Sequence, residues 1–205
     1  MDALLTQFAA IEFIDWIGML SGIIGVALST RERLSAWPFF IICYSAYIYI
    51  SLRSRLYAFG AMNTGFVFIS VYGWCKWSGI INTNQKNTDT LRISSLPQPF
   101  RPYLLGVIAT GTLSIGLTLS LLTDGHLPFL DAFAVSNALL AQWMLSRKYL
   151  ENWLFWIIAN STYIALFVSI QLWTSVILFS IFILLACKGW HDWKQSMTNN
   201  PTPKL

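Results

Sequence analysis

The sequence repeats one stretch of itself after 116 residues. Residues 31–48 read RERLSAWPFFIICYSAYI, residues 147–164 read RKYLENWLFWIIANSTYI, and nine of the eighteen aligned pairs are identical. A constant offset without a gap indicates an internal duplication, which constrains the fold more than any short motif does. The same shift aligns further pairs downstream: Leu56 with Leu172, Phe66 with Phe182, Gly73 with Gly189, and Trp77 with Trp193.

The composition indicates an integral membrane protein. Of the 205 residues, 56% are hydrophobic and 11% are charged, whereas a soluble domain carries about 25% charged residues. The three cysteines stand alone in apolar segments, without the paired spacing of a disulfide frame or a metal site. Residues 1–8 contain Asp2 and neither Lys nor Arg, so we expect no cleavable signal peptide.

The lengths of the apolar runs predict the number of helices. A bilayer core about 30 Å thick requires about 20 apolar residues per helix. The chain supplies seven segments near that length, so we expect an all-α membrane protein with seven transmembrane helices. Their expected positions are residues 11–29, 37–52, 56–77, 103–122, 128–145, 152–170 and 172–193.

The duplication divides these helices into two copies of three and one connector. Residues 11–77 are expected to form the first three-helix repeat and residues 127–193 the second, while residues 103–122 form a connecting transmembrane helix. Residues 78–102 read as a polar linker, and residues 194–205 as a cytoplasmic tail. One connecting helix reverses the chain once, so both repeats cross the membrane in the same direction, as a parallel 3+1+3 repeat.

The distribution of positive charge predicts the orientation. Eleven of the thirteen Lys and Arg residues lie on one side of the predicted bundle, whereas Arg53 and Arg55 lie on the other. The positive-inside bias then places the N-terminus outside and the C-terminus in the cytoplasm. Topology accounts for the net charge of +4, so we expect no nucleic-acid partner.

No residue pattern indicates an enzyme. The sequence shows no nucleophile with a base, no paired carboxylates and no metal ligands at fixed spacing, so we expect no catalytic residue, metal or cofactor. Asp15 and Asp131 are matched by the repeat, near the outer end of the first helix of each copy. They are either residues of an outer gate or acids that interact with a helix end.

Four residues of the sixth predicted helix share one face. Trp153, Trp156, Asn160 and Tyr163 follow spacings of 3, 4 and 3, which is helical periodicity. An asparagine in hydrocarbon finds no water and must face protein or a polar cavity. The stripe is therefore either a substrate site or a set of packing tryptophans with an interhelical hydrogen bond.

Comparison of the two copies favours a substrate site to a small degree. Residues kept by both copies, such as Trp37 with Trp153, are expected to be architectural. Positions that diverged are candidates for binding an asymmetric substrate, and they are Phe40 with Trp156 and Tyr44 with Asn160. Other polar residues expected inside the membrane either complete the site or only link helices: Asn63, Asn137 and Gln142.

The motif RKYLENWLFWIIAN, together with LYAFGAMNTGFVFISVYGWCKW in the first half, resembles the Pnu family of bacterial vitamin transporters. The resemblance extends from the first helix to Trp193. It implies a 3+1+3 bundle similar to the SWEET sugar transporters, assembled as a homotrimer in the bacterial inner membrane. It also implies facilitated diffusion of a vitamin, which a cytoplasmic vitamin kinase traps by phosphorylation. The family motif NWxxWxxxN then places Trp153, Trp156 and Asn160 in the substrate site.

The expected substrate is a water-soluble vitamin with a flat cationic ring. Indole faces attract such a ring by about 0.5–2 kcal/mol when desolvated, and the amides of Asn160 and Asn63 would hydrogen-bond its polar groups. The resemblance implies a Gln in riboside carriers where this chain has Asn63, and an acid near Leu178. We therefore favour thiamine over nicotinamide riboside, which is the alternative within the same family. A non-transporting scaffold or a channel is a further alternative.

Overall fold

The computed structural model describes residues 12–53, 57–81, 91–123 and 127–199. Expectations for residue 11 and residues 54–56 of the first repeat, 82–90 of the linker and 200–205 of the tail lie outside this described part.

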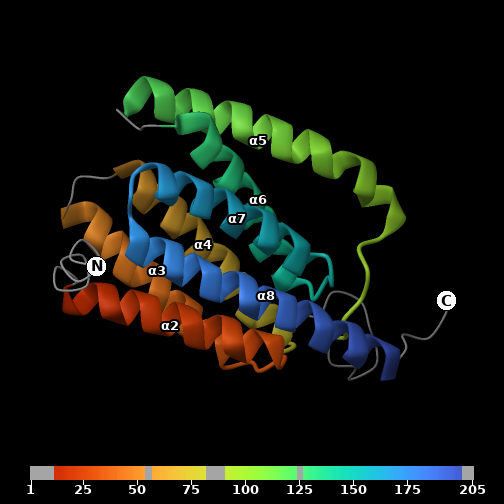
Figure 1. Ribbon diagram of the computed structural model, residues 1–205. Helices are drawn as coiled ribbons and strands as arrows, with labels where there is room; N and C mark the ends of the chain where they lie inside the picture. Colours follow the sequence, from red (N-terminus) through yellow and green to blue (C-terminus); the bar gives the residue numbers. More distant parts are fainter. Residues whose placement is uncertain (1–11, 54–56, 82–90, 124–126, 200–205) are drawn as a thin grey trace.

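Seven long α-helices form the described fold (Figure 1). They are α2 (Phe13–Thr30), α3 (Ala36–Arg53), α4 (Tyr57–Trp77), α5 (Arg101–Leu122), α6 (Pro128–Ser146), α7 (Asn152–Ser169) and α8 (Trp173–Asn199). A short 3-10 turn, η1 (Gln98–Phe100), precedes α5, and Pro102 fits the first turn of α5 because no backbone donor is needed there. One helix end differs clearly from the expected position, since α8 continues past residue 193 into the predicted tail.

Most helices that follow one another in the chain pack side by side, as α2 does with α3 and α6 with α7. Two further contacts join the first three helices to the last three, since α2 packs on α8 and α4 packs on α6. The two helices of each of these pairs run in the same direction (Figure 1). The core of the bundle therefore lies between α2, α3 and α4 on one side and α6, α7 and α8 on the other.

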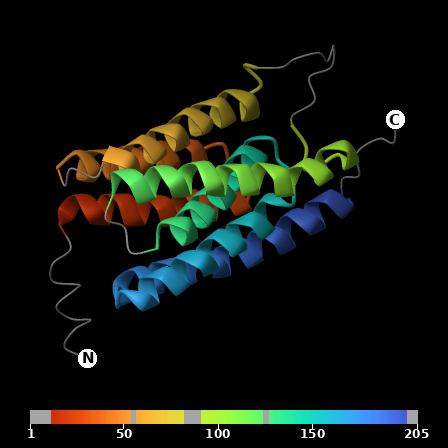
Figure 2. The ribbon, with the colours of Figure 1, turned by 90° about the horizontal axis from the view of Figure 1, so that it is seen from above.

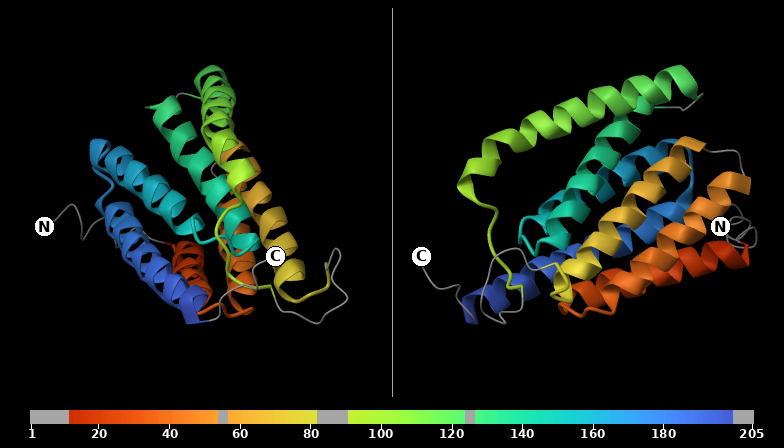
Figure 3. Two further views of the ribbon diagram at one scale, coloured as in Figure 1. Left: turned by 90° about the vertical axis from the view of Figure 1, so that its right-hand side faces the viewer. Right: turned by 180° about the vertical axis from the view of Figure 1, so that it is seen from behind.

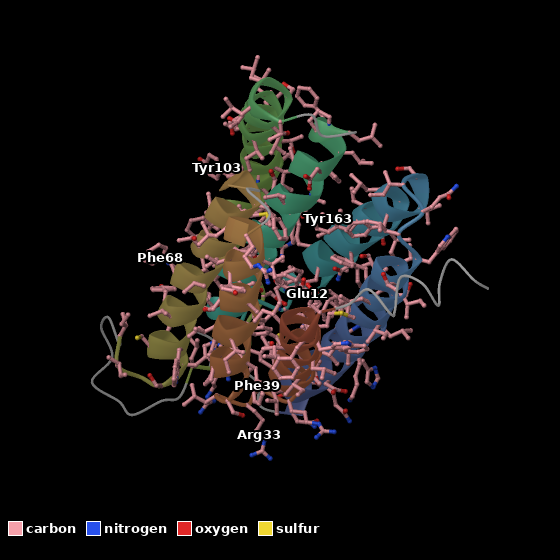
Figure 4. The ribbon with its side chains drawn as sticks, turned by 90° about the vertical axis from the view of Figure 1, so that its left-hand side faces the viewer. Glu12, Arg33, Phe39, Phe68, Tyr103 and Tyr163 are labelled. Atoms are coloured by element: carbon pink, nitrogen blue, oxygen red, sulfur yellow. The ribbon has the colours of Figure 1, made fainter. Side chains whose placement is uncertain are left out.

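The helix α5 lies at the edge of the bundle, where it packs mainly on α6 (Figures 2 and 3). Gly116 is its one buried residue, whereas Leu105 and Leu121 are 78% and 80% exposed. Figure 4 shows Tyr103 of α5 and Phe68 of α4 pointing outward, and both are largely exposed. An apolar outer surface of this kind suits a lipid environment.

Four of the described helical segments are long and apolar enough to cross a membrane, namely α2, η1 with α5, α7 and α8. The less apolar α6 carries twelve buried residues, many of them Ala and Ser. Small residues let neighbouring helices approach closely. Because protein covers α6 on most of its surface, it can hold Asn137 and Gln142 inside a membrane.

The turns after α2 and α6 share one unusual backbone conformation. Glu32 and Lys148 have φ angles of 54° and 55°. The N–H of Arg33 donates to the carbonyl of Leu28 (3.1 Å), and the N–H of Tyr149 to that of Met144 (3.0 Å). These bonds belong to Schellman motifs, in which glycine is the usual residue at positive φ. Any other residue in this conformation costs about 1–2 kcal/mol, yet both turns hold a charged side chain.

Candidate substrate site

Side chains from four helices meet between α3, α4, α6 and α7. Phe66 of α4, Ala138 of α6 and Ala159 of α7 are buried together, and Tyr44 of α3 and Trp156 of α7 pack against them. The rings of Tyr44 and Phe66 are stacked, with centroids 4.9 Å apart and an interplanar angle of 16°. We call these five residues the central cluster. It offers flat aromatic faces in the interior of the bundle.

Asn160 brings an unpartnered amide to the central cluster. It follows Ala159 and lies one helical turn from Trp156, so the two side chains share a face of α7. Asn160 is 4% exposed, yet its amide forms no hydrogen bond with any residue that the structure describes. Its amide atoms are also not among the fully buried side-chain atoms that lack a partner, so they keep some accessible surface. This position therefore suits a polar group of a bound molecule.

Asn63 lies three residues before Phe66 on α4, and Asn137 lies next to Ala138 on α6. The Nδ2 atom of each donates a 2.8 Å hydrogen bond within its own helix, to the carbonyls of Phe59 and Phe133 respectively. Both asparagines are buried, and their side-chain oxygens accept no hydrogen bond from the described residues. These bonds hold the two amides in place and leave their oxygens available as acceptors.

Gln142 links α6 to α4. Its Nε2 atom donates to Oγ of Ser70 over 3.1 Å, and Ser70 donates in turn to the carbonyl of Phe66 over 2.8 Å. The Oε1 atom of Gln142 is buried and accepts no hydrogen bond within the described chain. Gln142 therefore forms an interhelical bond of the kind that polar residues commonly form in membranes, one turn of α4 away from the central cluster.

Four tryptophans form a second layer next to the central cluster. Trp153 is 1% exposed and contacts Trp193 edge to face, with centroids 5.3 Å apart. Trp37, its repeat partner, contacts Trp77 in the same way at 5.2 Å. We call these four residues the tryptophan layer. The structure thus places Trp153 in a packed core, whereas Trp156 lies in the central cluster.

Phe40 also belongs to the core around the tryptophan layer. Its ring fills the space beside Gly25, where an added Cβ would lie 2.8 Å from the ring. It also stacks on Tyr44, at a centroid distance of 6.3 Å. Of the candidates that diverged between the copies, Tyr44 and Trp156 therefore belong to the central cluster. Asn160 lies on the same face of α7 as Trp156, and Phe40 packs against both Gly25 and Tyr44.

The two repeat-matched aspartates lie in different surroundings. The Oδ2 atom of Asp15 accepts a 3.0 Å hydrogen bond from the backbone N–H of Glu12, which caps the start of α2. Asp131 lines a cavity of about 120 Å³ between α5, α6 and α7, together with Leu127 and Leu166. Asp15 thus has the helix-end contact expected of such an acid, and neither aspartate belongs to the central cluster.

Phe66 is the central-cluster aromatic that sequence reasoning did not single out. Because Phe66 and Phe182 are identical in the two copies, their identity indicated architecture only. Its position three residues after Asn63, on the same helical face, was the available signal. Leu178, which stands where the family resemblance implies an acid, is buried in α8.

The chain matches the family model described as nicotinamide mononucleotide transporter over residues 12–195. The nicotinamide riboside transporter PnuC of Escherichia coli is 24% identical, with 91% of this chain and 87% of the relative aligned. For PnuC of Haemophilus influenzae the identity is 27%, with 87% and 79% aligned. The riboflavin/roseoflavin transporter RibM of Streptomyces davaonensis is 23% identical, with 93% and 89% aligned.

A solved structure has the same fold. The crystal structure of the vitamin B3 transporter PnuC matches with a TM-score of 0.74 over 96% of this chain and 87% of that chain, at 20% sequence identity. At that identity, the match establishes the all-helical fold alone. The family model spans the described helices from α2 into α8, so the chain belongs to the nicotinamide mononucleotide transporter family, the Pnu family of membrane vitamin transporters.

Proposed function

We propose that the chain is a facilitator that carries nicotinamide riboside across the bacterial inner membrane. The observation that carries this proposal is Asn160, which is 4% exposed, shares a face of α7 with Trp156 and has no hydrogen-bond partner among the described residues. A nicotinamide ring would lie against Trp156 and Tyr44. Its carboxamide and the ribose hydroxyls would then take up the hydrogen bonds that Asn160, Asn63 and Asn137 leave open.

The energetics of such a site suit a carrier. A desolvated indole face contributes about 0.5–2 kcal/mol to binding a cationic ring, and a neutral hydrogen bond contributes about 0.5–1.5 kcal/mol. Among the described residues, no carboxylate belongs to the central cluster, so no ion pair would hold the cation. The substrate can therefore be released on either side, and phosphorylation by a cytoplasmic vitamin kinase would keep it inside the cell.

The relatives favour nicotinamide riboside over thiamine. The similar proteins described above are named for nicotinamide riboside or for riboflavin. We therefore correct the preference for thiamine that Asn63 and Leu178 suggested. The class of substrate, a vitamin with a flat ring, is unchanged.

Nicotinamide riboside is expected to raise the melting temperature of the purified protein. A ligand at about 100 times its Kd stabilises the folded state by about 2.7 kcal/mol, which corresponds to about 5–10 °C for a chain of this size. A thermal-shift panel would compare nicotinamide riboside with thiamine, riboflavin and uncharged nucleosides. A shift with thiamine alone would contradict this substrate assignment, and no shift with any vitamin would favour a scaffold.

We further propose that the two three-helix units are parallel repeats joined by α5, with all seven helices crossing the membrane. Two hydrogen bonds between the units are related by the shift of 116 residues. The indole N–H of Trp77 donates to the carbonyl of Leu145 (3.3 Å), and that of Trp193 donates to the carbonyl of Ser29 (3.1 Å). Such matched contacts support a two-fold relation between the units. The homotrimer implied by the family resemblance stays a prediction.

A reporter fused after Leu205 is expected to be active only in the cytoplasm. Most of the described Lys and Arg residues lie at one end of the bundle, in the turns after α2 and α6 and in the last turns of α8. Figure 4 shows Arg33 at this end. The positive-inside bias assigns that end to the cytoplasm. Paired fusions to green fluorescent protein and alkaline phosphatase would measure the orientation. Phosphatase activity of the fusion in intact cells would instead place the C-terminus outside the cytoplasm and contradict the predicted orientation.

A further inference from the structure

Glu32 and Lys148 are related by the shift of 116 residues, and they contact each other. The Nζ atom of Lys148 lies 2.8 Å from Oε2 of Glu32, and Oε1 of Glu32 accepts a 2.9 Å hydrogen bond from Ser196 of α8. The ammonium group of Lys148 also lies 4.6 Å from the ring centroid of Trp77. The side chain of Lys148 is 11% exposed. One network therefore joins a turn of each three-helix unit to α4 and α8.

A second repeat-matched contact lies beside this network. Trp77 and Trp193 face each other across the boundary between the units, with ring centroids 6.2 Å apart. Ile93 from the segment before η1 is 4% exposed and packs into the same core. Along α4, Phe66 of the central cluster is followed by Gly73 and Trp77, so this core separates the central cluster from the end of the bundle that carries Glu32 and Lys148.

A cavity of about 310 Å³ lies at that end of the bundle. Its lining includes Glu32, Lys148, Ser196 and Met197, together with Ile93. A pocket for a small molecule typically starts at about 300 Å³, so the cavity is large enough to admit a molecule the size of a vitamin. The ion pair forms part of its wall.

We propose that the Glu32–Lys148 and Trp77–Trp193 pairs form the cytoplasmic gate of the transport path, with this cavity as its vestibule. The proposal rests on the proposed transport function. A molecule that leaves the central cluster for the vestibule must separate the two units at these contacts. A half-buried ion pair suits a gate because water solvates both charges when the pair opens, so the closed state is not strongly favoured. Residues 32 and 148 both have positive φ angles, at which glycine is the usual residue, and a glycine there would supply no charge.

Thiol labelling measures this gate without any substrate. Ser70, which is 0% exposed, lies between the central cluster and the tryptophan layer along α4. The full-length parent for the test carries Ser70→Cys, with the three native cysteines replaced by alanine. Inside-out vesicles expose its cytoplasmic face to a membrane-impermeant methanethiosulfonate reagent. The rate of modification of Ser70→Cys then reports how often the cytoplasmic side opens.

Removing either charge is expected to speed labelling about tenfold, since each removal leaves the partner ion unpaired. Glu32→Gln and Lys148→Met are the two neutral variants. The swapped variant, Glu32→Lys with Lys148→Glu, restores one charge of each sign and is expected to return the rate to within about twofold of the parent. Asp192→Asn is the matched control, because Asp192 pairs with Lys188 along the surface of α8 and its loss should leave the rate unchanged.

Unchanged labelling in both neutral variants would overturn the gate, and so would a swapped variant that is labelled as fast as they are. If a neutral variant does not fold, the test uses the swapped variant. Slow labelling of Ser70→Cys in that variant supports the gate, and rapid labelling overturns it. The labelling is independent of the ligand panel. A labelling pattern that follows charge, with no vitamin shifting the melting temperature, would therefore keep the gate and reject the substrate.

Discussion

Replacing Asn160 with leucine is expected to weaken the binding of nicotinamide riboside about 10- to 100-fold while the protein stays folded. The leucine removes an amide that has no hydrogen-bond partner among the described residues, so no contact within that part of the chain is lost. A polar group of the ligand would be left buried and unpaired, which costs about 1–3 kcal/mol, and each 1.4 kcal/mol is about tenfold in Kd. Isothermal titration calorimetry on the purified protein measures the change.

Ser161→Leu is the matched control for this variant. Ser161 is the next residue of α7, but it is exposed on the outside of the bundle. The replacement makes a similar change from polar to apolar on the same helix, and the affinity should not change. An Asn160→Leu protein with the parent affinity would remove Asn160 from the site. An equal loss in both variants would point to a general disturbance of α7.

Replacing Gly73 with alanine is expected to lower the melting temperature by about 2–12 °C. A Cβ at this position would overlap the ring of Trp37, which is fully buried and cannot move aside. Overpacking of a dense core typically costs about 1–3 kcal/mol, and each kcal/mol shifts the melting temperature of a chain this size by about 2–4 °C. Gly189→Ala is expected to behave alike, because its Cβ would overlap the ring of Trp153.

Gly65→Ala is the control on the same helix. No heavy atom lies within 4 Å of a Cβ built at Gly65, and alanine is favoured over glycine inside a helix by about 0.5–1 kcal/mol. Its melting temperature should therefore equal or exceed that of the parent in a fluorimetric scan in detergent. If Gly73→Ala melted at the temperature of Gly65→Ala, the tight packing of the tryptophan layer would be contradicted.

The positions of the helices followed from the sequence because apolar runs, charged turns and the repeat all act locally. The end of α8 did not, since residues 194–199 are polar apart from Met197 and remain helical beyond the apolar run. The sequence also did not predict that α6 would be the most buried helix. Its small residues indicate close neighbours, but they do not say which helices these are.

The candidate site was predicted only in part. Helical periodicity correctly put Trp156 and Asn160 on one face of α7, and the divergence between the copies pointed to Tyr44, which the structure brings to the same cluster. Trp153 shares that face but lies one turn along the helix, where it meets α8 instead. Helical periodicity predicts on which face of a helix a side chain lies. It does not predict which neighbouring helix that side chain contacts at its level along the helix axis. Asn63 and Leu178 were likewise a weak basis for predicting the identity of the vitamin, because the sequence does not give the side chains that surround them.

The contact between residues 32 and 148 has a consequence for how such a protein can be built. Under the proposed two-fold relation between the units, a residue beside the axis meets its own counterpart. Two identical halves associating as a dimer would therefore set glutamate against glutamate, or lysine against lysine, and like charges in contact repel. Two halves of different sequence can place opposite charges at the two positions, as the halves of this chain do. Its halves have thus become complementary and are no longer interchangeable, and a protein assembled from two first halves would lose this attraction.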